Sequence, residues 1–195
     1  MADKNKQIIK MVGVALFIAI VVVFQILGSF IRFGPFSVSL VLVPIVVGAA
    51  IYGPGTGALL GGAFGVVVII NCINGVDAGG NILWTANPFA TAALCLLKGI
   101  LAGYSSGYVY KKIAVKKKYT AVFVSAVVCP TMNTGIFLTA LFFIFRGILA
   151  DWASAAGADV LYYLFVIIAG MNYLPELCVN IILCPAILRV INAVK

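Results

Sequence analysis

The sequence contains no histidine and very little charge. Of its 195 residues only 9% are charged, and just five are aspartate or glutamate. Histidine is the commonest protein ligand for metals, and the five cysteines form no Cys-x-x-Cys pair. The chain also lacks clustered aspartates and an H-E-x-x-H motif. We therefore expect no metal site, no cofactor and no enzyme.

Hydrophobic residues dominate what is present. They make up 64% of the chain, and the mean hydropathy is +1.21. A soluble domain is nearer half apolar and a quarter charged, so this composition indicates an integral membrane protein. One transmembrane helix needs about 20 apolar residues, which allows roughly six here. We predict an all-α fold, a six-helix transmembrane bundle with short loops and one membrane domain over residues 1–195, with spans near 8–30, 36–52, 56–73, 88–110, 119–145 and 160–190.

The positive charges predict how this bundle is oriented. The net charge is +8, and five lysines crowd the short segment 111–118. With six spans, both termini and this segment lie on one side of the membrane, opposite Arg32 and Arg146. Because basic loops stay in the cytoplasm, we predict that both termini are cytoplasmic. The orientation of the bundle in the membrane accounts for the net positive charge. This charge is therefore no sign of nucleic-acid binding, and we expect no nucleic-acid partner.

Small residues recur at helical spacing in several spans. Ala15 and Ala19 stand one turn apart in the first span, a spacing that lets a second helix approach closely in lipid, although ordinary alanine filling also explains it. Glycines follow the same spacing in two further spans, at positions 57, 61 and 65 and at 99, 103 and 107. The string GPGTGALLGG lacks the Gly-Lys-Ser/Thr ending of a nucleotide-binding loop. We interpret these glycines as helix-packing residues.

Residues 71–88 form the longest polar connection between predicted spans. Asn81, Trp84 and Asn87 lie within it. Such a loop is a candidate lid over a ligand site, and a plain connection is an equal alternative.

Several polar side chains fall inside the predicted spans. At 1.5 Å per residue, Lys98, Asn133 and Glu176 lie about 15, 20 and 22 Å below the outer ends of their helices. All three are therefore near the middle of a core about 30 Å thick. Asn172 shares a helical face with Glu176, and Thr131 and Thr134 add hydroxyls close to Asn133. Intramembrane charges usually mark a site, so we predict a shared polar cavity; a structural Lys98–Glu176 ion pair is the alternative.

The order of these features resembles one family of membrane proteins. The Ala15-x-x-x-Ala19 pair is followed by the runs FGPFSVSLVLVPIVVGAAIYGPGTGALLGGAFG, NPFATAALCLLKGILAG and VVCPTMNTGIF. Together they are similar to the substrate-binding S components of energy-coupling factor (ECF) vitamin transporters, in particular the group that includes riboflavin and pantothenate components. The resemblance covers nearly the whole chain.

This resemblance implies a multi-pass protein of the bacterial cytoplasmic membrane. Such a component captures a vitamin-sized molecule near its outer side and works with a membrane scaffold, EcfT, and two subunits that hydrolyse ATP. The scaffold contact would fall on Ala15 and Ala19. The candidate ligand-binding residues are Lys98, Asn133, Asn172 and Glu176, with Asn81, Trp84 and Asn87 from the loop and Thr131 from the fifth span.

The substrate does not follow from the resemblance. Lys98 suits a carboxylate, which favours a pantothenate-like small acid, although Glu176 could neutralise the lysine instead. Riboflavin, another vitamin or a nucleobase is an alternative substrate. A facilitator or channel that works alone is the main rival function, and a small membrane enzyme ranks third.

Overall fold

A computed structural model describes residues 2–29, 32–33, 36–37 and 39–194, whose regular secondary structure is helical apart from two short paired strands. The predicted helical membrane fold is therefore confirmed. In this part of the chain, five helical stretches are long and apolar enough to cross a membrane: Gln7–Gly28, Pro54–Ile73, Pro88–Ile113, Lys118–Phe143 and Val160–Ile182. They belong to α1 (Ala2–Gly28), α3 (Pro54–Ile73), α5 (Pro88–Ile113), α6 (Lys118–Phe143) and the run from α8 (Val160–Tyr162) to α9 (Ala169–Ile182).

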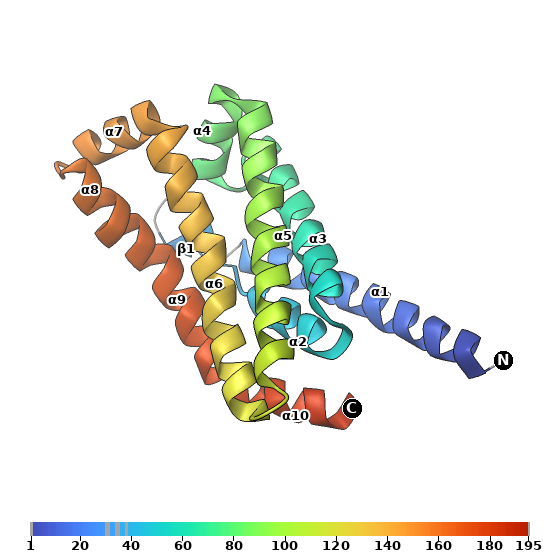
Figure 1. Cartoon of the computed structure of the whole chain (residues 1–195). Helices are drawn as coiled ribbons and strands as arrows, with labels where there is room; N and C mark the ends of the chain where they lie inside the picture. Colours follow the sequence, from blue (N-terminus) through green and yellow to red (C-terminus); the bar gives the residue numbers. More distant parts are fainter. Residues whose placement is uncertain (1, 30–31, 34–35, 38, 195) are drawn as a thin grey trace.

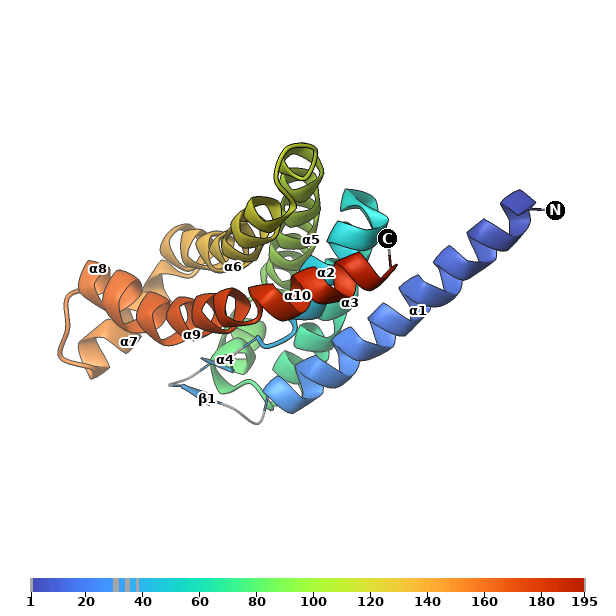
Figure 2. The same cartoon turned by 90° about the horizontal axis from the view of Figure 1, so that it is seen from below.

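The long helices form an irregular bundle. Figure 1 shows α3, α5, α6 and α9 running side by side, with the turn between α5 and α6 at the lower end of the view. The C-terminal helix α10 (Cys184–Val194) also lies at this lower end. α1 crosses α2 (Leu42–Tyr52) and α3 obliquely, and its N-terminal half extends away from the other helices (Figures 1 and 2).

The second span differs from the prediction. Residues 36–52 do not form one helix, because β1 (Arg32–Phe33) pairs antiparallel with β2 (Phe36–Ser37) and α2 begins only at Leu42. The 11 residues of α2 extend about 16 Å, roughly half of a bilayer core. Pro44 fits in the first turn of α2, where a missing N–H leaves no bond unmade. α2 is a short and mostly buried helix that cannot span a membrane alone.

Close packing of α3 against α5 organises the bundle. Gly61 and Gly99 face each other so closely that a Cβ on either residue would overlap the carbonyl oxygen of the other. Gly57 and Gly103 form an equivalent pair one turn further along. This arrangement confirms the prediction that the two glycine stripes bring helices together. The tight contact fixes the distance between the two helices that carry one wall of the pocket described below.

Two regions predicted as loops contain helices at the other end of the bundle. α4 (Ala78–Ala86) lies between α3 and α5, and α7 (Arg146–Ala155) lies between α6 and α8 (Figure 1). The final span also ends earlier than the predicted residue 190. It contains a π-helical segment, η1 (Tyr163–Ile168), and stops at Ile182, after which α10 takes a new direction. Pro185 lacks the N–H that would continue the helical ladder there.

Candidate ligand-binding site

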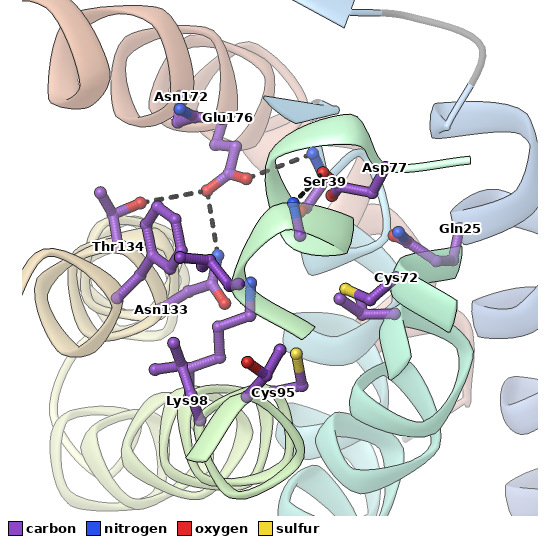
Figure 3. Close-up of a pocket in the computed structure, with 16 residues that line it drawn as sticks. Gln25, Ser39, Cys72, Asp77, Cys95, Lys98, Asn133, Thr134, Asn172 and Glu176 are labelled. Atoms are coloured by element: carbon purple, nitrogen blue, oxygen red, sulfur yellow. Dashed lines mark hydrogen bonds between the residues drawn. The ribbon is translucent and has the colours of Figure 1, made fainter. Parts of the chain in front are cut away.

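A polar pocket lies at the end of the bundle away from the lysine-rich turn, between α1, α3, α4, α5, α6 and α9 (Figure 3). Its polar lining comes from Gln25, Ser39, Cys72, Asp77, Thr91, Cys95, Lys98, Asn133, Thr134, Asn172 and Glu176. The free volume is about 40 Å³, which holds a few water molecules. Pockets for vitamin-sized ligands measure about 300 Å³ or more, so the walls must separate when such a ligand enters.

Glu176 is the most deeply buried charged residue of the pocket, with 3% of its surface exposed. Its Oε1 accepts a hydrogen bond from the backbone N–H of Ser39 at 3.2 Å. Its Oε2 accepts from Asn133 Nδ2 at 3.3 Å and from Thr134 Oγ1 at 3.4 Å (Figure 3). A buried carboxylate is tolerated only when such donors replace the lost water. The non-helical linker before α2 and one face of α6 therefore supply three donors, each at 3.2 to 3.4 Å.

Glu176 belongs to a polar stripe along α9. Asn172, Glu176 and Asn180 recur every four residues, and all three are buried. Asn172 Nδ2 donates to the carbonyl oxygen of Ile168 at 3.0 Å, and Asn180 Nδ2 donates to that of Glu176 at 2.8 Å. The stripe faces α6 rather than lipid. Asn172 and Glu176 line the pocket, and Asn180 lies one turn beyond it.

Lys98 enters the pocket from α5 but does not pair with Glu176. Its Nζ lies 5.7 Å from the ring centroid of Phe64 and 5.1 Å from that of Phe137. Aromatic faces attract an ammonium group by about 0.5 to 2 kcal/mol each, which holds the side chain in place. None of the hydrogen bonds drawn in Figure 3 joins Lys98 to Glu176, whose own acceptors face Ser39, Asn133 and Thr134. The arrangement thus disfavours the structural ion pair considered above.

Four of the predicted site residues thus meet in one pocket, and four others lie outside its lining. Asn81 Nδ2 donates to the carbonyl oxygen of Cys72 at 2.8 Å, which ties α4 to the end of α3. Asn87 caps α5 by accepting from the backbone N–H of Ala90 at 3.1 Å. Trp84 packs partly buried against the main apolar core. Thr131 is exposed on another face of α6, where its hydroxyl lies 3.0 Å from that of Tyr173.

The structure adds pocket residues that the sequence reasoning did not select. Gln25 is buried on α1, and its position as an amide inside an apolar run was a usable signal. Asp77, from the loop after the third predicted span, caps α4 by accepting from the backbone N–H of Gly80 at 2.9 Å. Ser39 contributes through its backbone N–H, for which no sequence signal exists.

Two features bear on whether the pocket could bind a metal ion or act as a hydrolase. Within the ranges that the structure describes, no three histidine, cysteine, aspartate or glutamate side chains are grouped to hold a metal ion. The letters of Gly103-Tyr-Ser105-Ser-Gly107 match the G-x-S-x-G pattern of some hydrolases. They lie inside the continuous helix α5, however, and the Ser105 hydroxyl donates to the carbonyl oxygen of Leu101 at 2.6 Å. The pattern requires a strand-to-helix turn, so it has no catalytic meaning here.

The fold and the pocket define a multi-pass membrane protein with a polar cavity between its helices. The family model described as "ECF transporter, substrate-specific component" matches residues 9–188, and the chain belongs to this family. It is therefore the substrate-specific component of a transporter and not an enzyme. No curated protein matches the chain significantly.

Proposed function

We propose that this component captures a vitamin-sized organic acid, of pantothenate-like size and polarity, in the pocket around Lys98. The observation that carries the proposal is the different surroundings of two charged residues of the pocket, the buried Glu176 and the half-buried Lys98. Glu176 has three hydrogen-bond donors from the protein, whereas the Lys98 ammonium group has aromatic neighbours and no carboxylate bonded to it (Figure 3). A charge at this depth usually marks a ligand or ion pathway. A carboxylate on the ligand would complete the coordination of Lys98.

The position of the pocket supports capture from the outer side. It lies between the N-terminal part of α5 and the C-terminal part of α3, at the end opposite the five lysines of residues 111–118. Basic segments favour the cytoplasm, so the pocket faces outward in this orientation. Its small free volume implies that α4 and the neighbouring helix ends move apart to admit the ligand and close over it afterwards.

Delivery into the cell requires partners, because the chain carries no nucleotide-binding motif. We propose that an EcfT-type scaffold and two ATPase subunits supply the energy. α1 supports this assignment, since Ala15 and Ala19 are exposed and face away from α2 and α3. Their small side chains leave room for a helix of the scaffold to approach within close van der Waals distance.

The proposal is tested by identifying the bound molecule and then changing Lys98. The purified protein is denatured, and any released small molecule is identified by mass spectrometry; a panel of vitamins, nucleobases and small acids is then compared by thermal shift. We expect an organic acid at near one-to-one ratio. Lys98→Met keeps the aliphatic stem against Phe64 and Phe137 but removes the charge, and should weaken binding of that acid at least about tenfold.

Lys112→Met is the matched control. Lys112 is also placed against an aromatic ring, with its Nζ 4.6 Å from the ring centroid of Tyr108, but it lies at the opposite end of α5. This variant should bind the acid as the wild type does. A neutral ligand whose affinity does not change in Lys98→Met would show that the acid assignment is wrong. No ligand across the panel, together with no co-purifying ATPase subunits, would favour a channel or a facilitator.

A further inference from the structure

Two buried carbonyl oxygens of the pocket have no hydrogen-bond partner among the residues that the structure describes. They are Asn133 Oδ1 and Gln25 Oε1, in residues that are 4% and 2% exposed. Most buried polar atoms in proteins are hydrogen-bonded, and an unsatisfied one calls for an explanation such as water or a ligand. Both atoms are acceptors, and both residues line the same pocket as Lys98.

The orientation of the Asn133 amide is determined by Glu176. Its Nδ2 donates to the Glu176 carboxylate, and a reversed amide would place two oxygens against each other. The carbonyl oxygen therefore points away from the carboxylate, on the side where Lys98 enters (Figure 3). Asn133 thus presents a fixed acceptor to the pocket.

Gln25 lies on the other side of the pocket, on α1 (Figure 3). It interrupts an otherwise apolar helix face, since its neighbour one turn before, Val21, is fully buried in the main core. An amide buried among apolar groups is costly unless its polar atoms find partners. The apolar core would pack against α1 without a glutamine. A ligand that reaches α1 would give this amide the hydrogen-bond partner that the core does not provide.

We propose that the ligand spans the pocket from Lys98 to Gln25 and carries N–H or O–H donors as well as its acidic group. The donors bind Asn133 Oδ1 and Gln25 Oε1, and the acidic group binds Lys98. The ligand class is therefore a small acid with amide or hydroxyl groups, rather than a simple aliphatic or aromatic acid. This inference rests on the proposed function and narrows its substrate class.

Water explains why the donors of the ligand matter. The cavity has room for a few water molecules, which can hydrogen-bond to both acceptors when no ligand is bound. A ligand that displaces such water without replacing its hydrogen bonds loses affinity. An acid without donors would therefore leave two acceptors unsatisfied, and each should weaken binding about tenfold.

Three probe molecules separate the contribution of the acidic group from that of the N–H and O–H donors. Their binding to the purified full chain is compared by thermal shift and calorimetry. Pantothenate has a carboxylate together with amide and hydroxyl donors, pantothenol has the donors without the carboxylate, and octanoate has the carboxylate without the donors. We expect pantothenate to bind at least about tenfold more tightly than either of the others. Octanoate binding as tightly as pantothenate would overturn the inference. Equal binding of pantothenol and pantothenate would instead contradict the acid assignment and leave the donor inference standing.

A pair of glutamine variants tests the role of α1. Gln25→Met keeps the length of the side chain and removes its acceptor, and should weaken pantothenate about tenfold without lowering the melting temperature of the free protein. Gln7→Met, at an exposed position of the same helix, should have no effect. Unchanged affinity in Gln25→Met would overturn the inference.

If none of the probes binds, the molecule released by denaturation replaces them in the same variants. A released ligand without N–H or O–H donors, or one unaffected by Gln25→Met, would also overturn the inference. If neither a probe nor a released ligand binds, the proposed function fails and this inference fails with it.

Discussion

Asn133 joins α6 to α9 by donating from Nδ2 to Oε2 of Glu176 at 3.3 Å. Together with Thr134 and the backbone N–H of Ser39, it gives this buried carboxylate three hydrogen-bond donors from the protein. Glu176 thus holds three segments of the chain together. Lys98 lines the same pocket, and we propose that it is the charged group that meets the ligand.

Substitutions of Glu176 should show how much this residue contributes to the stability of the fold. Glu176→Leu leaves three buried donors without an acceptor, and each unsatisfied group costs about 1 to 3 kcal/mol. We expect the free energy of unfolding to fall by about 3 kcal/mol or more. Glu176→Gln retains one acceptor for Ser39, and its new NH₂ group can bind Asn133 if the asparagine amide reverses. Its loss should be about 1 kcal/mol, measured by thermal or denaturant unfolding in detergent.

The same reversal has a consequence for the ligand. In Glu176→Gln the carbonyl oxygen of Asn133 turns toward position 176 and is no longer presented to the pocket. We therefore expect Glu176→Gln to weaken ligand binding about tenfold even though the protein stays folded. Equal melting temperatures for Glu176→Leu and the wild type would show that the three hydrogen bonds contribute nothing to stability.

Two threonines of α6 should differ in their effect on the ligand. Thr134 lines the pocket and donates to Glu176, whereas Thr131 is exposed beside Tyr173 and lies outside the pocket lining. Thr134→Val removes one donor with little change in shape and should cost about 1 kcal/mol of stability and weaken the ligand several-fold. Thr131→Val should leave ligand affinity unchanged in the same calorimetric measurement. A larger effect at Thr131 would place the ligand on the α5–α6 surface instead.

The sequence predicted those parts of the pocket that are formed by polar side chains inside apolar segments. Lys98, Asn133, Asn172 and Glu176 were selected because a polar group inside an apolar run is costly, and the structure brings all four to one cavity. The helical period placed Asn172 and Glu176 on one face of α9. Depth along each helix then placed residues from three helices at the same level. Costly residues are few, so they are informative even without a structure.

Other parts of the site depend on backbone geometry that residue types do not encode. Asn81 and Asn87 looked like ligand contacts in a polar loop, but amides also cap helices and tie loops, which is what both do here. The apolar run at residues 36–52 was long enough for a span, yet only its second part is helical. That break exposes the backbone N–H of Ser39 to Glu176, a contact for which any residue except proline would serve.

The close approach of α3 and α5 gives a prediction with an adjacent control. Gly61→Ala adds a methyl group that overlaps the carbonyl oxygen of Gly99, which belongs to the backbone and cannot rotate away. The two helices must separate, and we expect a loss of about 2 kcal/mol or more in thermal unfolding. Gly62→Ala places its methyl group 3.6 Å from the Ile100 side chain, an ordinary contact. Alanine favours the helix over glycine by about 1 kcal/mol, so this variant should be as stable as the wild type or slightly more stable.

The exposed small residues of α1 should matter for assembly and not for the fold. Ala15→Leu combined with Ala19→Leu enlarges two side chains that face away from α2 and α3, so the melting temperature and the ligand affinity should not change. The larger side chains would keep a scaffold helix at a distance, and co-purification with EcfT and the ATPase subunits should be lost. Ala93→Leu is the control, because it is also exposed but lies on α5. Assembly that survives the α1 double substitution, or fails equally in Ala93→Leu, would show that the scaffold does not dock on this face of α1.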